Sequence, residues 1–427
     1  MTESEPAPER AERTRVVVTG MGAVSPYGPG VDLLWDKLLA GESAIKPIEN
    51  FDISGFSCTI GGEIRDFDAR DFIDRKSARR MARFTHFAVA AAREAIENAQ
   101  LDLDSLDRSR IGVVLGNGAG GYPEIQATAS TLFDRGGMRL DPLFLPKVLP
   151  NMAAANIAMQ FGLLGYNTTV VTACAAGTQA LGDATNVIRN GQADIVITGG
   201  TEAGFCQLGL GGFAVMRALS TKNENPTAAS RPFDADRDGF VPGEGAGIIV
   251  LESEESARRR GVNYQVELAG FGSSADAHHL VMPDADGAGP IRAINWAMED
   301  ADIQPEEIDY VNAHGTSTPL NDASETRAIK IALGEAAHNV PVSSTKSMIG
   351  HIFGGAGGLE SIAAIKAITD GKIHPTINYT TPDPECDLDY VPNQSRHAEV
   401  DAVLKNSFGF GGQNACLVFR RIDGARA

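Results

Sequence analysis

The chain has 427 residues, 43% of them hydrophobic and 22% charged, a composition that excludes a disordered or collagen-like protein and allows two or three structural units. Its formal net charge of −18 argues against a protein that wraps nucleic acid or lies on an anionic membrane. The five cysteines form no CxxC pair, so neither a disulfide framework nor a zinc site is expected, and a reducing, cytoplasmic compartment is favoured.

The N-terminal part is expected to be a tail followed by alternating strands and helices. Residues 1–14 contain four Glu, two Arg and two Pro but no apolar stretch, which predicts a disordered acidic tail rather than a signal peptide. A strand is predicted over 15–18, helices over 32–40 and 80–99, and a strand over 111–115. The basic stretch at 75–83 is by itself typical of a solvated helix face.

The strand at 111–115 leads into a glycine-rich segment at 116–121, which matches the G-x-G-x-x-G pattern of nucleotide-binding loops. A nucleotide site also needs a helix that opens at the last glycine and an acidic residue at the end of the next strand. The polar segment from 122 to 141 supplies neither feature. A tight turn is therefore the favoured interpretation, and no cofactor is expected.

Cys174 lies in the segment TTVVTACAAGTQALGDA, between a predicted strand at 169–172 and a predicted helix at 175–190. This order places the thiol at a helix N-terminus, where unpaired N–H groups and the helix dipole favour a thiolate. The competing interpretation is a small buried side chain at a strand–helix crossing. We expect that structural role for the other cysteines, Cys58, Cys206, Cys386 and Cys416.

The middle of the chain contains two more predicted strands, a segment that resembles a calcium loop, and the boundary between the two halves. Strands are predicted over 195–198 and 247–251. The segment DADRDG at 234–239 resembles the start of a calcium loop, but the twelfth position is Gly245 instead of Glu, so we expect an acidic turn and no metal. The charged stretch at 252–262 has no strand signal and divides the chain into halves at 15–261 and 262–427.

Two histidines and a lysine follow predicted strand ends in the second half. His314 lies in NAHGTST after a strand at 308–312, and Lys346 and His351 lie in STKSMIGH after a strand at 340–343. Such turns, rich in Gly, Ser and Thr, are unusual places for core or surface histidines. The remaining histidines lack this context and are interpreted as structural or solvated: His86, His278, His279, His338, His374 and His397.

The rest of the second half continues the alternation. A strand is predicted over 266–271, helices over 288–300, 324–333 and 357–370, and a last strand over 415–419. The segment NSFGFGG places Phe410 between glycines, which favours a mobile apolar flap over a core anchor. Apolar strands separated by helices predict sheets covered on both faces, and hence a layered α/β architecture.

Five motifs together resemble the β-ketoacyl-[acyl-carrier-protein] synthases, specifically the elongating synthase II type, in their order and spacing. These motifs are VTACAAGTQA, RPFDADRDGFVPGEGA, NAHGTST, STKSMIGH and NSFGFGG. The resemblance runs from about residue 15 to residue 420. It implies the thiolase fold: two similar halves, the first with the nucleophile and the second with both catalytic histidines, in a five-layered αβαβα homodimer. It also implies decarboxylative condensation of an acyl thioester with malonyl-acyl carrier protein during fatty-acid elongation, with no cofactor.

The same resemblance implies a role for each site residue. Cys174 would be the nucleophile, His314 and His351 the decarboxylating pair, and Lys346 with Glu360 would organise the electrostatics. The backbone N–H groups of Cys174 and Phe410 would form an oxyanion hole. Further residues would gate and line the acyl pocket (Phe410, Phe408, Ala119, Phe213), bind pantetheine (Thr316, Thr318) and form a basic rim for the acidic carrier (Lys76, Arg79, Arg80, Arg217).

Many relatives carry a bulkier aliphatic residue where this chain has Ala119, so medium-to-long or branched acyl groups are expected, unless Phe213 or Leu210 fills the gap. Two other functions stay open at this point. A ketosynthase subunit of a dissociated polyketide pathway uses the same residues, and a non-catalytic partner subunit would not use them at all.

Overall fold

The structure, a computed structural model, describes residues 13–422. All but the last two residues of the predicted tail at 1–14 therefore lie outside the described residues. The main strands are β1 (Val16–Ser25), β5 (Ile111–Gly116), β6 (Asn167–Val170), β7 (Ile195–Glu202), β8 (Gly245–Ser253), β9 (Val266–Ala275), β10 (Tyr310–Asn312), β11 (Val342–Ser343), β14 (Ala402–Gly409) and β15 (Gln413–Arg421). Short strands are β2 (Gly28–Pro29), β3 (Lys46–Pro47), β4 (Ile60–Gly61), β12 (Lys372–Ile373) and β13 (Arg396–His397).

The helices separate these strands along the chain. They are α1 (Val31–Leu39), α2 (Arg75–Ala78), α3 (Arg83–Asn98), α4 (Tyr122–Arg135), α5 (Phe144–Val148), α6 (Met152–Phe161), α7 (Ala176–Arg189), α8 (Gln207–Val215), α9 (Glu254–Arg260), α10 (Ala288–Ala301), α11 (Pro319–Leu333), α12 (Lys346–Ile349) and α13 (Ala356–Asp370). Two 3-10 turns, η4 (Ala173–Ala175) and η8 (Phe353–Gly355), precede α7 and α13. Within the described residues, no helix is long and apolar enough to cross a membrane.

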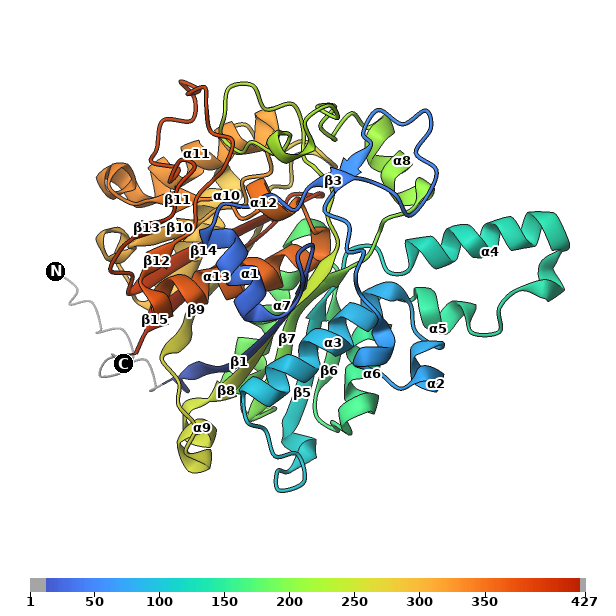
Figure 1. Cartoon of the computed structure of the whole chain (residues 1–427). Helices are drawn as coiled ribbons and strands as arrows, with labels where there is room; N and C mark the ends of the chain where they lie inside the picture. Colours follow the sequence, from blue (N-terminus) through green and yellow to red (C-terminus); the bar gives the residue numbers. More distant parts are fainter. Residues whose placement is uncertain (1–12, 423–427) are drawn as a thin grey trace.

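The strands form two sets with the same topology. The order is β6-β5-β7-β8-β1 in the first set and β11-β10-β14-β15-β9 in the second. In each set the first three strands of that order run parallel, and the last two pair antiparallel. The sets join where β1 meets β9, at Val17 opposite Glu267. Figure 1 shows the first set in blue to green and the second in yellow to red.

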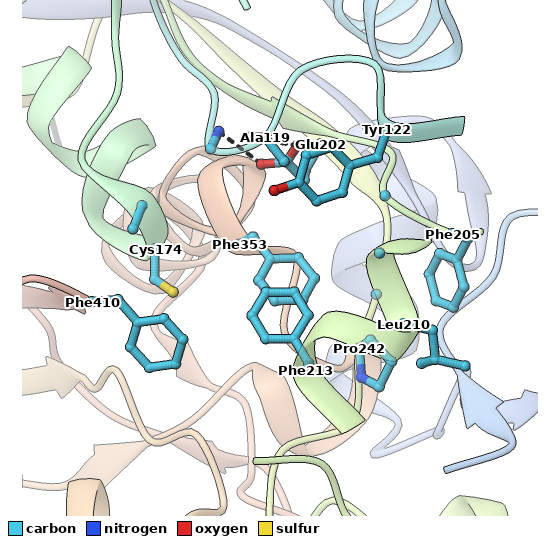
Figure 2. Close-up of a pocket in the computed structure, with 15 residues that line it drawn as sticks. Ala119, Tyr122, Cys174, Glu202, Phe205, Leu210, Phe213, Pro242, Phe353 and Phe410 are labelled. Carbon is cyan, nitrogen blue, oxygen red and sulfur yellow. Dashed lines mark hydrogen bonds between the residues drawn. The ribbon is translucent and has the colours of Figure 1, made fainter. Parts of the chain in front are cut away.

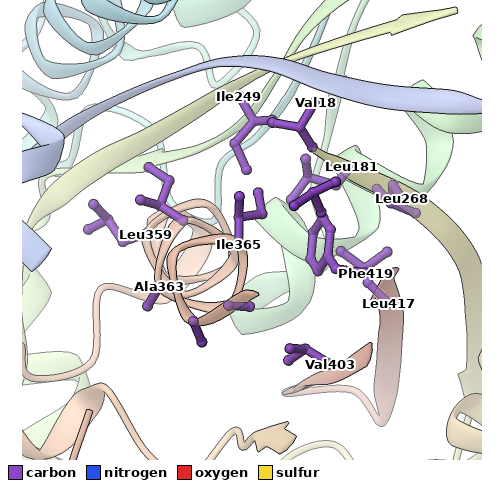
Figure 3. Close-up of a cluster of buried hydrophobic side chains, with 14 of the residues drawn as sticks. Val18, Leu181, Ile249, Leu268, Leu359, Ala363, Ile365, Val403, Leu417 and Phe419 are labelled. Atoms are coloured by element: carbon purple, nitrogen blue, oxygen red, sulfur yellow. The ribbon is translucent and has the colours of Figure 1, made fainter. Parts of the chain in front are cut away.

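Helices lie on both faces of each set of strands, which gives the five layers that the sequence analysis predicts. Helix α3 packs on β1, β7 and β8 at one outer face, and α10 packs on β9 and β15 at the other. Helices α7 and α13 pack on each other and contact strands of both sets, so they form the central layer. Figure 3 shows this core, where Leu181 of α7 and Ile365 of α13 meet Val18 and Phe419 from the two sets.

The burial of α13 explains its place in the centre. Residues 356–365 of this helix are all buried, on every face, as expected for a helix with strands on both sides. Its buried residues include a carboxylate, Glu360, which is 1% exposed. A charge in that position needs partners of opposite sign, and these lie in the site described below.

Two predictions about elements were wrong. Strand β14 was not predicted: it covers 402–409, and Phe410, the residue expected to form a flap, lies in the turn that follows it. The region 122–141, where no helix was expected to open at the last glycine of the G-x-G-x-x-G pattern, begins with α4, which projects from the body of the molecule (Figure 1). None of the residues of α4 is buried, although Ile125, Leu132 and Phe133 recur at helical spacing, so its apolar side chains are left at least partly exposed within this chain.

Candidate active site

Cys174 lies at a sharp turn between β6 and α7, as the sequence predicts. Ala173 has a φ of 48°, in the left-handed region that a residue with a side chain rarely adopts. The chain then forms η4 and enters α7 directly. Such strain is typical of functional sites, where the surrounding packing holds it in place. Here it fixes the backbone immediately before the thiol, which is 7% exposed.

The electrostatics of Cys174 differ from the thiolate that its position at a helix N-terminus predicts. Burial raises the pKa of the Cys174 thiol to about 12. The ammonium of Lys346 and the backbone N–H groups of Phe410 and Cys174 oppose this shift but do not outweigh it. The resting site therefore holds a neutral thiol at pH 7, because little water remains to solvate a thiolate.

His314 and His351 lie next to each other and face the cavity that contains Cys174. Their ring centroids are 5.5 Å apart with an interplanar angle of 85°, and each residue is 3% exposed. Burial, with the positive charge of Lys346, holds the pKa of both imidazoles well below the usual value. Both rings are therefore neutral at pH 7, so each can donate from only one nitrogen.

The hydrogen bonds of the two rings indicate which nitrogen carries the proton. The Lys346 ammonium, which has only donors, lies 3.4 Å from His314 Nδ1, and the Phe353 N–H donates to His351 Nδ1 over 3.3 Å. Each Nδ1 therefore accepts, and each Nε2 keeps its proton as a donor. Two N–H donors are thus available to an oxygen that gains negative charge.

Lys346 and Glu360 form a buried ion pair, as predicted, but the pair has a third member. The Lys346 ammonium contacts Glu360 Oε1 and donates to the carbonyl oxygen of His314 over 2.7 Å. Lys405, which the sequence analysis did not single out, lies 2.7 Å from Glu360 Oε2. Burial alone would raise the pKa of Glu360, but the two ammonium groups lower it to about 2.

Two cavities meet at Cys174. The inner cavity, of about 200 Å³, contains Ala119 and Leu210 in its wall, and the outer cavity, of about 580 Å³, contains both histidines. Cys174, Phe213, Phe353 and Phe410 line both cavities. Figure 2 shows Phe213 stacked on Phe353, with Phe410 beside the thiol. The three rings thus separate the inner cavity from the outer one.

Phe353 is a further residue that the sequence analysis missed. Its φ is 45°, its ring stacks on Phe213 at 4.7 Å, and it lies 4.9 Å from the ring of His351. A phenylalanine that follows His351 and precedes two glycines could have indicated this position, as the same pattern did for Phe410. Phe408 contacts the ring of His314 at 5.7 Å and lines the outer cavity.

The glycine-rich turn at 116–121 holds a protein carboxylate. The N–H groups of Gly118, Ala119 and Gly354 donate to the buried side chain of Glu202 (Figure 2). Burial raises the pKa of Glu202 to about 7, and these N–H groups oppose the shift. Gly116 has a separate packing role, because a Cβ there would lie 2.2 Å from the backbone of Ala176 in α7.

The residues expected at the mouth of the site fall into two groups. Arg217 is exposed and lines the outer cavity with Thr316 and Thr318, whose hydroxyl oxygens are 2.9 Å apart. Lys76, Arg79 and Arg80 are exposed on α2 and the turn after it, but they do not line that cavity. In the described residues no group of three or more His, Cys, Asp or Glu could hold a metal ion.

Comparisons with known proteins agree with this geometry. Residues 13–257 match the model of the β-ketoacyl synthase N-terminal domain, and residues 266–380 match that of the C-terminal domain. The chain is 51% identical to 3-oxoacyl-[acyl-carrier-protein] synthase 2 of Synechocystis sp., over 96% of this chain and 99% of the relative. It is 47% identical to the protein of that name from Staphylococcus aureus, over 97% of this chain and the whole relative.

Solved structures of ketosynthases share the fold. The ishigamide ketosynthase/chain length factor superposes with a TM-score of 0.91 at 38% identity, over 96% of this chain and all of that one. A type II polyketide-synthase acyl carrier protein in complex with its ketosynthase, bound to the hexaketide, gives a TM-score of 0.88 at 36% identity with the same coverage.

Proposed function

The chain belongs to the β-ketoacyl synthase family, and from this premise we propose how its site condenses an acyl thioester with malonyl-acyl carrier protein in fatty-acid elongation. One observation carries the assignment of residues: a buried thiol and two neutral imidazoles with free N–H donors face one cavity. A thiol can hold the acyl group as a thioester, and the imidazoles can stabilise an enolate.

The first half-reaction transfers the acyl group to Cys174. Sγ attacks the thioester carbonyl of the acyl carrier, the bond to the carrier sulfur breaks, and the Cys174 proton ends on the released carrier thiol. The backbone N–H groups of Phe410 and Cys174 act on the Cys174 thiol, which supports a role for them as the oxyanion hole, a contribution of about 3–4 kcal/mol in comparable sites. The acyl chain then lies in the inner cavity.

The second half-reaction uses the histidines. Malonyl carrier enters the outer cavity and loses carbon dioxide, and the electron pair of the broken C–C bond forms an enolate at the thioester. The Nε2–H groups of His314 and His351 donate hydrogen bonds to that oxygen. The α-carbon attacks the acyl carbonyl on Cys174, the C–S bond breaks, and the Cys174 thiolate leaves with the β-ketoacyl carrier as product.

The partner of the reaction is an acyl carrier protein. Arg217 at the mouth of the outer cavity, with Lys76 on α2 and Arg79 and Arg80 in the turn after it, offers positive charge to an acidic carrier on a protein whose net charge is −18. Thr316 and Thr318 line the same cavity as Arg217 and Cys174, which supports a role for their hydroxyl groups in binding the pantetheine arm.

The three phenylalanines between the cavities support a gating role. Gly411 and Gly412, with φ of 84° and 69°, allow the turn that carries Phe410 to change conformation. Leu210 and Phe213 line the inner cavity beside Ala119 yet leave about 200 Å³ open, which supports acceptance of medium-to-long or branched acyl groups.

The chain is divided into halves at 15–261 and 262–427, and this boundary lies between α9 and β9. The working form of the protein is a homodimer in the cytoplasm. Strand β6 ends one side of the sheet, and the segment from α4 up to this strand exposes large apolar side chains: Phe133, Met138, Leu145, Met159 and Leu164. A second copy would cover this surface. Light scattering on the purified protein checks the dimer, and a monomeric mass would contradict it.

A polyketide ketosynthase uses the same chemistry, but the synthase 2 relatives, at 47–51% identity, are more similar than the polyketide structures at 36–38%. Mass spectrometry after incubation with acyl carrier protein tests the catalytic function. An acyl adduct on Cys174, converted to β-ketoacyl carrier by malonyl carrier, is expected. A non-catalytic partner subunit would give neither.

A further inference from the structure

Lys405 is a buried charge in the middle of a strand, and the steps above do not use it. It lies in β14, is 0% exposed, and is flanked in sequence by the buried residues Leu404 and Asn406. Its ammonium lies 2.7 Å from Glu360 Oε2, donates to the carbonyl oxygen of Asn406 over 2.8 Å, and contacts the hydroxyl of Ser407. All three are acceptors, which is the set that an ammonium requires.

The ion pair of Lys405 continues to the catalytic histidines. Glu360 uses one oxygen for Lys405 and the other for Lys346, and Lys346 in turn donates to the backbone of His314. Two ammonium groups and one carboxylate leave a formal charge of +1 inside the protein. Without Lys405 the carboxylate would balance Lys346, and the cluster would have no net charge.

A second path runs from Lys405 towards the nucleophile. The hydroxyl of Ser407, which Lys405 contacts, lies 2.8 Å from that of Thr178, one turn along α7 from Cys174. Beyond Ser407 the same strand carries Phe408 against His314 and leads to Phe410. Lys405 could therefore act through its charge or merely by holding this strand, and the two roles predict different results.

We propose that Lys405 is a positioning residue for the condensation, whose positive charge behind Glu360 keeps the His314–His351 pair neutral for decarboxylation. The proposal rests on the roles assigned above to the two histidines. The charged or titratable groups around the pair come from five elements: Cys174 of η4, Lys346 of α12, Glu360 of α13, Lys405 of β14, and Glu325 of α11, which accepts from the N–H of His314.

The charges in this set agree with the proposal. Burial is the main cause of the low pKa of His351, Lys346 lowers it further, Glu360 raises it, and Lys405 opposes Glu360. Lys405 also adds to the lowering of the pKa of His314. Removal of this charge therefore raises the pKa of both rings, and a protonated imidazole loses its role as a neutral donor.

The test compares Lys405→Met and Lys405→Arg in the full chain. Carbon dioxide release from malonyl carrier is measured from about pH 4.5 to about pH 8, and acylation of Cys174 is measured separately. In Lys405→Met we expect the acidic limb of the pH–rate profile, where carbon dioxide release falls with decreasing pH, to move up by about one pH unit. This is the usual effect of one nearby buried charge. In Lys405→Arg we expect the limb to stay at the wild-type pH even where the rate falls. Lys330→Met, which removes an exposed ion pair with Asp387, is the matched control and should resemble the wild type.

Several outcomes would overturn the proposal. A Lys405→Met enzyme with the wild-type pH profile, or equal shifts in Lys405→Met and Lys405→Arg, would leave only a structural role. If Lys405→Met does not fold, Lys405→Met/Glu360→Gln removes one charge of each sign and should keep the wild-type limb; a shifted limb contradicts the proposal. A wild-type enzyme that releases no carbon dioxide would instead contradict the proposed function.

Discussion

Glu360→Gln should destabilise the protein, because it removes the carboxylate that contacts both buried ammonium groups, those of Lys346 and Lys405. The pKa of Glu360 falls from 4.5 to about 2 on folding, and each pKa unit corresponds to about 1.4 kcal/mol, so the charged form contributes about 3 kcal/mol. This value agrees with the cost of about 3–5 kcal/mol that loss of one partner from a buried ion pair has in other proteins. For a chain of 427 residues this predicts a fall in Tm of about 3–5 °C.

The pH dependence gives the sign of the effect. Since the folded state lowers the pKa of Glu360, its contribution is fully present above pH 4.5 and is lost as the pH falls towards 2. Melting of the two proteins should therefore differ at pH 7, and the difference should become smaller below about pH 4.5. Differential scanning calorimetry at pH 7, 5 and 3.5 measures this.

A double-mutant cycle with Lys405→Met supplies the control. Glu360→Gln alone leaves two like charges together, whereas Lys405→Met/Glu360→Gln leaves only Lys346. The double variant should therefore lose less stability than the sum of the two single variants. Additive losses, or a Glu360→Gln protein that melts within about 1 °C of the wild type at pH 7, would refute the electrostatic argument.

Three further predictions concern the reaction. Cys174→Gln should abolish acyl transfer and leave malonyl decarboxylation intact or enhanced. His314→Ala should leave acylation measurable and reduce decarboxylation about 10²–10³-fold, the usual effect of losing one oxyanion donor. Equal loss of both half-reactions in both variants would contradict the assigned roles. Ala119→Phe should fill the inner cavity and shift the preference towards short acyl groups about tenfold, because each of two excluded methylenes is worth about 0.8 kcal/mol. If the variant and the wild type give parallel acylation profiles for primers of graded length, the cavity does not bind the chain end. Phe410→Ala should let malonyl carrier react before acylation, and an unchanged order of substrates in single-turnover experiments would argue against a gate.

The architecture and the main site residues could be predicted because their signals are local. Apolar strands alternate with helices, and Cys174 and His314 each lie in a short turn rich in small residues after a strand, whereas His351 follows the short helix α12 after β11. Glu360 could be assigned only through the resemblance, because nothing in a helix of Ala, Gly and Ile indicates that one carboxylate contacts residues far away in the chain.

The predictions that failed depended on contacts between distant segments. Lys405 interrupts the apolar pattern of β14, which therefore resembles a loop, and its partner Glu360 lies 45 positions earlier in the sequence. The expected thiolate at Cys174 followed from the local helix N-terminus, but burial by Phe410 and other distant residues outweighs that effect. Helix α4 is a different case, because Ile125, Leu132 and Phe133 at helical spacing were a local signal that the sequence analysis did not use.

The repeated topology has a consequence for motion at the site. Both central helices begin with the same device, a 3-10 turn whose first residue is left-handed: Ala173 at φ 48° before α7, and Phe353 at φ 45° before α13. Rotation of either backbone out of this conformation would disrupt the helix start that packs in the core. Phe353 is therefore held as firmly as the nucleophile, whereas Phe410 precedes two glycines. Of the rings between the cavities, Phe353 forms the fixed wall against which Phe410 can open and close.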